Sequence, residues 1–558
     1  MRPFLLVVVL LIVVLLIALP LAAQQKDFGE VAFANSGAPA AQEEFLRGLA
    51  LLHDFEYPSA AGHFRKAQEI DLAFAMAYWG EAMTRTHPIW FQKDLPAARA
   101  VLQRLGATPV ARAARAPSPR ERDYLGAIEI LYGEGSKDER DNRYADAMMT
   151  LHGRYPDDVD ATAFAALALL GTSHHGRDFA TYMRAAAMLE EVFPMHQRHP
   201  GVLHYLIHSY DDSIHAPLGM RAARLYGSVA PQAGHALHMT SHIFIAMGMW
   251  DDVIAANRQA IAVVNRQRAS RKQQPADCGH YPIWLHYAYL QEKRFDDAAK
   301  ALEACRASAL DVPFESAGEM DARESRFASL GEMRAHQLAS GGPAVPSFAV
   351  PDGIPYANAR FLMAYADVLA AAGVRGKLQT AVERLRSLAG DSAAGHHGGM
   401  SGTRDDGRHP VMLQESEALL LLASGKRDEA IAMMQKTAVA ERSMPFEFGP
   451  PPVPKPASEL LGDLLLSAGR NADAETAYRD ALSRAPGRAA SVKGLEMAKK
   501  GSAPPASLPA GAASSRRDSA RNPAGRDAGE PAGKDAGATK GKSIPSQPVS
   551  SRGAAKST

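Results

Sequence analysis

Residues 457–486, ASELLGDLLLSAGRNADAETAYRDALSRAP, carry the clearest indication of the fold class. Apolar residues recur at helical spacing on both sides of the turn SAGRN, which predicts two helices joined by a short connection. Gly462 and Ala474 are small enough to let these helices approach closely, and Tyr478 can fill the space between them. Pro486 ends the second helix, because proline cannot continue it. The stretch therefore predicts an antiparallel helical hairpin.

Similar hairpins recur along the chain, in residues 46–71, 247–261, 292–307 and 416–438. One hairpin cannot bury its hydrophobic face alone, so repeated hairpins stack into a solenoid. The spacing resembles that of tetratricopeptide repeat (TPR) proteins over much of residues 40–495, with degenerate repeats near 90–200 and 310–400. The resemblance implies an all-α, TPR-type α-solenoid, a superhelix of antiparallel helical hairpins whose concave groove binds ligands.

Composition and motifs narrow the function classes. The 558 residues are 46% hydrophobic and 22% charged, with a formal net charge of +1. Near-neutral charge gives no general attraction to nucleic acid, so we expect no nucleic-acid partner. The chain has no H-E-x-x-H or G-x-S-x-G motif, so no particular reaction is predicted and a binding function is favoured over an enzymatic one.

The N-terminus predicts export. Residues 1–23 combine Arg2, an apolar run from Phe4 to Leu19 and the small pair Ala22-Ala23, as in a cleaved signal peptide. The run is short for a membrane-spanning helix, which needs roughly 17–25 residues, and an uncleaved N-terminal anchor is the alternative. We expect a periplasmic or secreted protein with no membrane span after signal cleavage.

Composition also divides the rest of the chain. The prediction is a helical solenoid over 24–390 with a His-rich centre at 196–286, a Gly-rich linker at 391–410, a C-terminal repeat pair at 411–498 and a tail at 499–558. The tail is mostly Ala, Gly, Ser and Pro, and it cannot bury enough apolar surface to fold. Ser118 and Glu121 predict a capping box that opens a helix in one of the degenerate repeats.

Two histidine pairs lie in the centre of the chain, in HPGVLHYLIHSY (199–210) and AGHALHMTSHIFIAMG (233–248). They are His204 with His208 and His238 with His242, offset by 34 residues at both positions. Residues i and i+4 share one face of a helix, so each pair points the same way. In the TPR register the pairs fall on the first helices of adjacent repeats, at positions that face the groove.

Imidazoles on facing helices can hold Zn, Cu, Fe or Ni. We therefore consider His204, His208, His238 and His242 as metal ligands, with His215, His235 and His286 as possible additional ligands. Asp211 and Asp212 follow His208 closely enough to orient an imidazole. The alternative is a structural or peptide-binding histidine cluster. Two hypotheses of function result: an exported TPR scaffold that binds a peptide or protein partner in its groove, and a His-ligated metalloprotein or metalloenzyme.

Residues 73–90, 199–208 and 233–252 also resemble exported bacterial TPR proteins with a His-rich middle region. Those proteins often carry a further histidine in the segment that matches 281–286. This chain has Ile283 there, which leaves His286 as the histidine of that segment. The resemblance implies the fold but no biochemical role.

The two cysteines, Cys278 and Cys305, are predicted to lie before the first helix and late in the second helix of one hairpin. Those two ends are neighbours in an antiparallel hairpin, so a disulfide is geometrically plausible. It would be worth about 3–4 kcal/mol on the chain-entropy model. The alternative is a buried thiol at Cys305.

Overall fold

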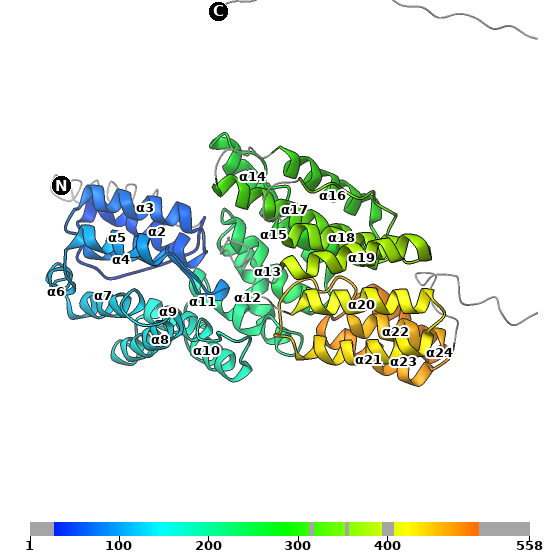
Figure 1. The fold of residues 1–558 in the computed structure, drawn as a ribbon. Helices are drawn as coiled ribbons and strands as arrows, with labels where there is room; N and C mark the ends of the chain where they lie inside the picture. Colours follow the sequence, from blue (N-terminus) through cyan, green and yellow to red (C-terminus); the bar gives the residue numbers. More distant parts are fainter. Residues whose placement is uncertain (1–26, 312–316, 352–356, 393–406, 502–558) are drawn as a thin grey trace, which may run out of the picture. The chain divides into compact units, whose positions relative to one another are not determined.

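The structure, a computed structural model, describes residues 27–311, 317–351, 357–392 and 407–501, and these residues form an all-helical repeat (Figure 1). Its elements are η1 (Pro39–Ala41), α2 (Gln42–His53), α3 (Tyr57–Ile70), α4 (Ala75–Met83), β1 (Thr86–His87), η2 (Pro88–Trp90), β2 (Gln92–Lys93), α5 (Leu95–Leu105), α6 (Pro109–Ala113), α7 (Pro119–Leu131), α8 (Lys137–Arg154), α9 (Val159–Leu170), α10 (Phe179–Val192), α11 (Pro200–Tyr210), α12 (Ala216–Val229), α13 (Gly234–Ala246), α14 (Trp250–Ser270), α15 (His280–Gln291), α16 (Phe295–Leu310), α17 (Ala317–Ala339), α18 (Ala357–Ala371), α19 (Arg375–Ser392), α20 (Arg408–Ala423), α21 (Arg427–Ser443), α22 (Ala457–Ser467), α23 (Asn471–Arg484) and α24 (Ala489–Lys500). The predicted signal peptide, residues 393–406 of the Gly-rich segment, and the tail beyond residue 501 lie outside the described residues.

Five hairpins turn in the same way. The second residue after the first helix has a positive φ of 55–79° in each, and the next backbone N–H donates to a carbonyl five residues earlier at 2.8–2.9 Å. The turn residues are Phe55, Gly248, Lys293, Gly425 and Gly469. This left-handed turn provides hydrogen-bond donors for backbone carbonyl groups that have no partner within the helix at its C-terminal end. The repetition of one turn geometry shows that these hairpins are copies of one structural unit.

Close contacts between glycine and aromatic residues hold neighbouring helices together. The Phe64 ring lies between Gly48 and Gly80, and a Cβ at Gly80 would be 2.3 Å from the ring. Tyr478 lies between Gly462 and Gly494 in the same way near the end of the described chain, where a Cβ at Gly462 would meet the ring at 2.8 Å. The small residues and the aromatic predicted from residues 457–486 therefore pack as expected.

The degenerate repeats are also helical. The predicted capping box is present at the start of α7, where the Ser118 hydroxyl accepts from the Glu121 backbone N–H. One insertion breaks the pattern: β1 and β2 form a short antiparallel hairpin with η2 between them. This insertion carries His87, whose ring stacks on Tyr57, and Trp90, whose ring contacts that of His235 in the histidine-rich centre described below.

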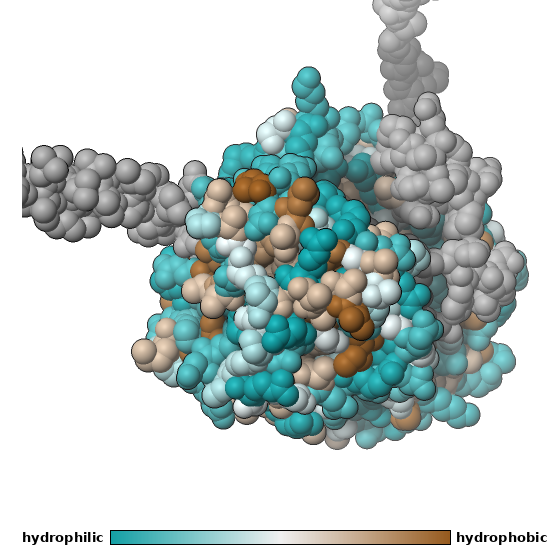
Figure 2. Space-filling model, turned by 90° about the vertical axis from the view of Figure 1, so that its left-hand side faces the viewer, coloured by the Kyte–Doolittle hydropathy of each residue, from teal (hydrophilic) through white to brown (hydrophobic). Residues whose placement is uncertain are grey.

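Hydrophobic side chains are scattered among hydrophilic ones on the face shown in Figure 2. No described helix is long and apolar enough to cross a membrane.

Cys278 and Cys305 form a disulfide, with their Cα atoms 4.3 Å apart. Cys278 precedes the N-cap of α15, and Cys305 lies late in α16. The cysteines occupy the ends of the hairpin that the sequence predicts.

Candidate metal centre

The predicted histidine pairs lie on α11 and α13, at the fifth and ninth residues of each helix. Their side chains are buried, with exposed fractions of 0% for His204 and His238, 1% for His208 and 2% for His242. The sequence predicts that these histidines face an open groove. In the structure, other parts of the chain cover them. Covered imidazoles are poorly placed to bind a peptide from solution.

Aromatic side chains from distant segments provide the cover. The Phe55 ring lies 4.2 Å from the His204 ring and 5.6 Å from the His235 ring, centroid to centroid. Phe448 lies 4.7 Å from His242 in the same measure. Phe55 adopts the left-handed conformation that glycine adopts in three of the other four turns (φ 57°), which is unfavourable for a bulky residue. Its ring is thereby packed against the histidines.

The first group of imidazoles is His204, His208 and His235, whose ligand atoms lie within 4.8 Å of one another. All three Nε2 atoms are buried and have no hydrogen-bond partner among the described residues. The Nδ1–H of His204 donates to the backbone carbonyl of His53 at 2.6 Å, which leaves a lone pair on Nε2. His208 donates from Nδ1 to Asp211 at 3.2 Å with the same result. His235 Nδ1 lies 3.4 Å from the Tyr281 hydroxyl, which can accept its proton.

The second group is His238, His242 and His280, again with ligand atoms within 4.8 Å. His238 and His242 are buried, whereas His280, the first residue of α15, is exposed. The Nε2 atoms of His238 and His242 lie 3.2 Å apart. Trp284 stacks on the His242 ring at 4.5 Å, which fixes the ring plane.

Asp211 joins the two groups. One of its carboxylate oxygens accepts from Nδ1 of both His208 and His242, at 3.2 and 3.0 Å, while the other pairs with Arg177. Burial alone would raise the pKa of Asp211, but the Arg177 charge and the two histidine hydrogen bonds outweigh burial and lower it. An ionised carboxylate therefore orients one imidazole of each group, as expected for a residue behind a metal ligand.

Burial favours the neutral form of His204, His235, His238 and His242, which is the form that binds a metal. It lowers the pKa of His242 to about 4, although Asp211 raises it in part. It also lowers the pKa of His204, His235 and His238, and each is lowered further by neighbouring imidazoles.

A third cluster, His53, Asp160 and His199, satisfies the same distance criterion but differs chemically. His53 Nε2 and His199 Nε2 both contact one Asp160 oxygen, at 2.8 and 3.3 Å. His53 Nδ1 contacts the Tyr205 hydroxyl and His199 Nδ1 accepts from the Val202 backbone. Every imidazole nitrogen of this cluster has a partner, so hydrogen bonding accounts for its geometry.

The structure thus divides the four predicted ligands between two groups, with His235 completing the first. The other two candidates lie apart from both groups. His215 contacts Asp212 at 2.8 Å and is partly exposed, and His286 is buried against Gln337 at 3.3 Å. Sequence reasoning missed His280, although it lies in the segment HYPIWLHY next to the expected position.

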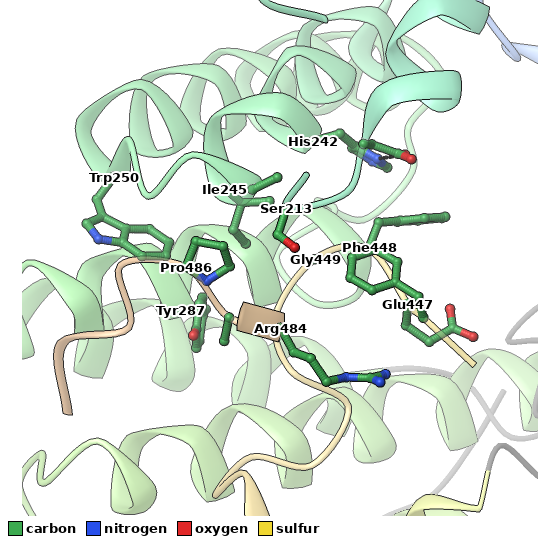
Figure 3. Close-up of a pocket in the computed structure, with 14 residues that line it drawn as sticks. Ser213, His242, Ile245, Trp250, Tyr287, Glu447, Phe448, Gly449, Arg484 and Pro486 are labelled. Atoms are coloured by element: carbon green, nitrogen blue, oxygen red, sulfur yellow. Dashed lines mark hydrogen bonds and ion pairs between the residues drawn. The ribbon is translucent and has the colours of Figure 1, made fainter. Parts of the chain in front are cut away.

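A small pocket opens beside the second group. Asp211 and His242 line it together with Trp250, Tyr287 and the segment 446–449. Figure 3 shows His242 and Phe448 on one side of the pocket and Trp250 and Tyr287 on the opposite side. The pocket lies between the His-rich repeats and the C-terminal repeats.

The chain is similar to several solved structures at the level of its helical repeat. The APC/C hetero-tetramer Cut9-Hcn1 shares 12% identity, with a TM-score of 0.33 over 84% of this chain and 78% of that chain. The P58(IPK) TPR domain shares 12% (TM-score 0.22, 83% and 98%), and yeast Tom70 shares 11% (TM-score 0.29, 83% and 95%). No protein-family profile matches the chain, and no curated protein matches its sequence.

TM-scores this low support no conclusion beyond that likeness. The assignment therefore rests on the repeated turns and on the glycine–aromatic contacts of the hairpins. The described residues form an almost entirely helical repeat of hairpins with the turn and packing geometry expected for a TPR-type solenoid. Its distinguishing feature is a buried, histidine-rich centre between adjacent repeats.

Proposed function

We propose that this protein binds a transition-metal ion through His204, His208 and His235. The observation that carries the proposal is the convergence of three buried histidines: one ring nitrogen of each lies within 4.8 Å of the others, and their Nε2 atoms have no hydrogen-bond partner among the residues that the structure describes. A buried polar atom without a partner costs about 1–3 kcal/mol. Three such costs at one point are removed if the lone pairs share a positive ion.

The residues behind these imidazoles support the proposal. A metal-binding histidine usually donates its other N–H to a carboxylate or a carbonyl, which fixes the ring and raises its basicity. His204 donates to the His53 carbonyl and His208 donates to Asp211. Neutral imidazole donors suit Zn, Cu, Fe and Ni. A site of three protein ligands leaves at least one coordination position open.

Elemental analysis of the untagged full-length protein, loaded with Zn²⁺ or Cu²⁺ and then dialysed, tests the proposal. The wild type is expected to retain the ion, and His204→Ala and His208→Ala are each expected to lower the stoichiometry by one ion per chain. His286→Ala is the matched control, because His286 is equally buried and belongs to neither group. Equal retention by His204→Ala and His286→Ala would contradict the proposal.

The second candidate function is an exported scaffold that binds a peptide or protein partner. The disulfide between Cys278 and Cys305 favours export, because disulfides persist in oxidising compartments. A helical repeat offers surface outside the covered histidines for such a partner. Fractionation of cells that express the full chain, followed by determination of the mature N-terminus, tests export and signal cleavage.

A further inference from the structure

We propose that His238, His242 and His280 form a second metal site, so that the protein carries a two-metal centre whose halves are joined through Asp211. This inference goes beyond the proposed function, because the second site uses different ligands and its own set of hydrogen bonds. The ligand class is a borderline first-row cation such as Zn²⁺, Co²⁺ or Cu²⁺, which imidazole donors prefer.

The positions of the ring protons in the second site follow from their neighbours. The Asn257 side-chain amide donates through Nδ2 to the Val253 carbonyl at 2.9 Å, so its oxygen faces His238 Nδ1 at 2.7 Å. His238 must then donate from Nδ1. His242 Nδ1 faces the Asp211 carboxylate at 3.0 Å and must also donate. Both neutral rings therefore carry lone pairs, and no proton, on Nε2.

Those two Nε2 atoms lie 3.2 Å apart. Two lone pairs that face each other repel unless a positive charge lies between them. With metal–nitrogen distances of about 2.0–2.1 Å and a tetrahedral angle, two imidazoles on one ion have nitrogens about 3.3 Å apart. The observed separation therefore matches two ligands of one ion, with tautomers that are already correct for binding.

His280 supplies the third ligand. Its ring centroid lies 4.6 Å from that of His238, and unlike the other two ligands it is exposed to solvent. It lies at the start of α15, whereas His238 and His242 lie on α13. Three protein ligands leave a coordination position for water or a small exogenous ligand. The first group, by contrast, lies entirely among buried residues.

The two sites are neighbours within one cluster. The rings of His208 and His242, one from each group, have centroids 5.4 Å apart, and both rings donate to the same oxygen of Asp211. A change at this carboxylate therefore acts on one ligand of each site. Each site is expected to bind its own ion, and the Asp211 carboxylate is expected to orient one ligand of both sites.

The test is a titration of the metal-free full-length protein with Co²⁺, followed by visible absorption, together with Zn²⁺ elemental analysis. The wild type is expected to bind two ions per chain. His280→Ala is the decisive variant, because His280 is the one ligand of this site that is exposed, whereas His238 and His242 are buried. This variant is expected to lower the affinity for one of the two ions at least tenfold, and His238→Asn is expected to have the same effect. His175→Ala, which removes another exposed histidine, is the matched control.

The outcomes separate this inference from the proposed function. If the wild type binds a single ion, or if His280→Ala leaves both affinities unchanged, the second site is overturned. Loss of one ion in His280→Ala together with full retention in His204→Ala would support the second site and overturn the first. Binding of no ion by the wild type would overturn both, and a proton shared by His238 and His242 would then account for the short contact.

Discussion

The shared carboxylate offers the sharpest single perturbation. Asp211→Asn keeps the size of the side chain but replaces one acceptor oxygen by an NH₂ group. In the structure the carboxylate receives Nδ1–H groups from His208 and His242 and pairs with the Arg177 guanidinium. An asparagine cannot accept from all three, so at least one buried N–H must face another N–H.

The expected size of the effect follows from these contacts. Removal of one partner from a buried ion pair costs 3–5 kcal/mol in general. Arg177 keeps Asp212 at 3.2 Å and the Ser209 carbonyl at 2.9 Å, so we expect a loss of about 2–4 kcal/mol in the stability of the metal-free protein. Loss of a residue that orients metal ligands weakens binding by about 10–100-fold, and we expect this at both sites.

Urea unfolding of the metal-free protein measures the first effect, and a competitive chelator titration measures the second. Asp463→Asn is the control, because Asp463 is a buried carboxylate that binds Lys455 and Tyr478 and no histidine. This control is expected to lose stability and to keep both metal affinities. If Asp211→Asn also keeps both affinities, Asp211 does not orient the ligands and the reasoning about the shared support is refuted.

Three further predictions concern the repeat itself. Burial raises the pKa of Glu441 to about 7 against an ordinary value of 4.5, despite hydrogen bonds from backbone N–H groups. The carboxyl group therefore binds its proton more tightly in the folded protein. Its contribution to stability is present below pH 4.5 and is lost as the pH rises through 7. Glu441→Gln is therefore expected to be more stable than the wild type at pH 8 by up to about 3 kcal/mol and no more stable at pH 4.5, as measured by urea unfolding; an equal difference at both pH values would contradict this. Gly462→Ala, whose Cβ would lie 2.8 Å from the Tyr478 ring, is expected to destabilise by about 1–3 kcal/mol, and an unchanged urea midpoint would show that the ring moves aside freely. Reduction of the Cys278–Cys305 disulfide is expected to cost about 3–4 kcal/mol, and an unaltered unfolding curve in reductant would argue against that contribution.

Much of the architecture could be predicted from the sequence because its determinants are local. Helical spacing, the turn residues and the glycine–aromatic pairs of residues 457–486 are short-range patterns, and each reappears in the structure. The same holds for the capping box at Ser118. The 34-residue offset also placed His204 and His238 correctly on the first helices of adjacent repeats, because a repeat carries each position over to its neighbour.

The candidate site depended on contacts that no local pattern encodes. The sequence grouped His204, His208, His238 and His242 together, whereas the structure divides them between two groups, because His235 of α13 lies beside the α11 pair and His280 of α15 lies beside the α13 pair. The cover from Phe55 and Phe448 comes from segments roughly 150 or more residues away in the chain, so burial could not be read from helical spacing.

That histidines recur at one register of a helical repeat can be read from the residue order alone. Their chemistry cannot, because the protonation of each ring depends on its partner across the fold. Asn257 and Asp211 accept from Nδ1 of His238 and His242, so Nε2 of each of these rings carries no proton. In His53 and His199, by contrast, both ring nitrogens form hydrogen bonds. Residue type and spacing are alike in the two cases, and the difference lies in which neighbour each imidazole meets.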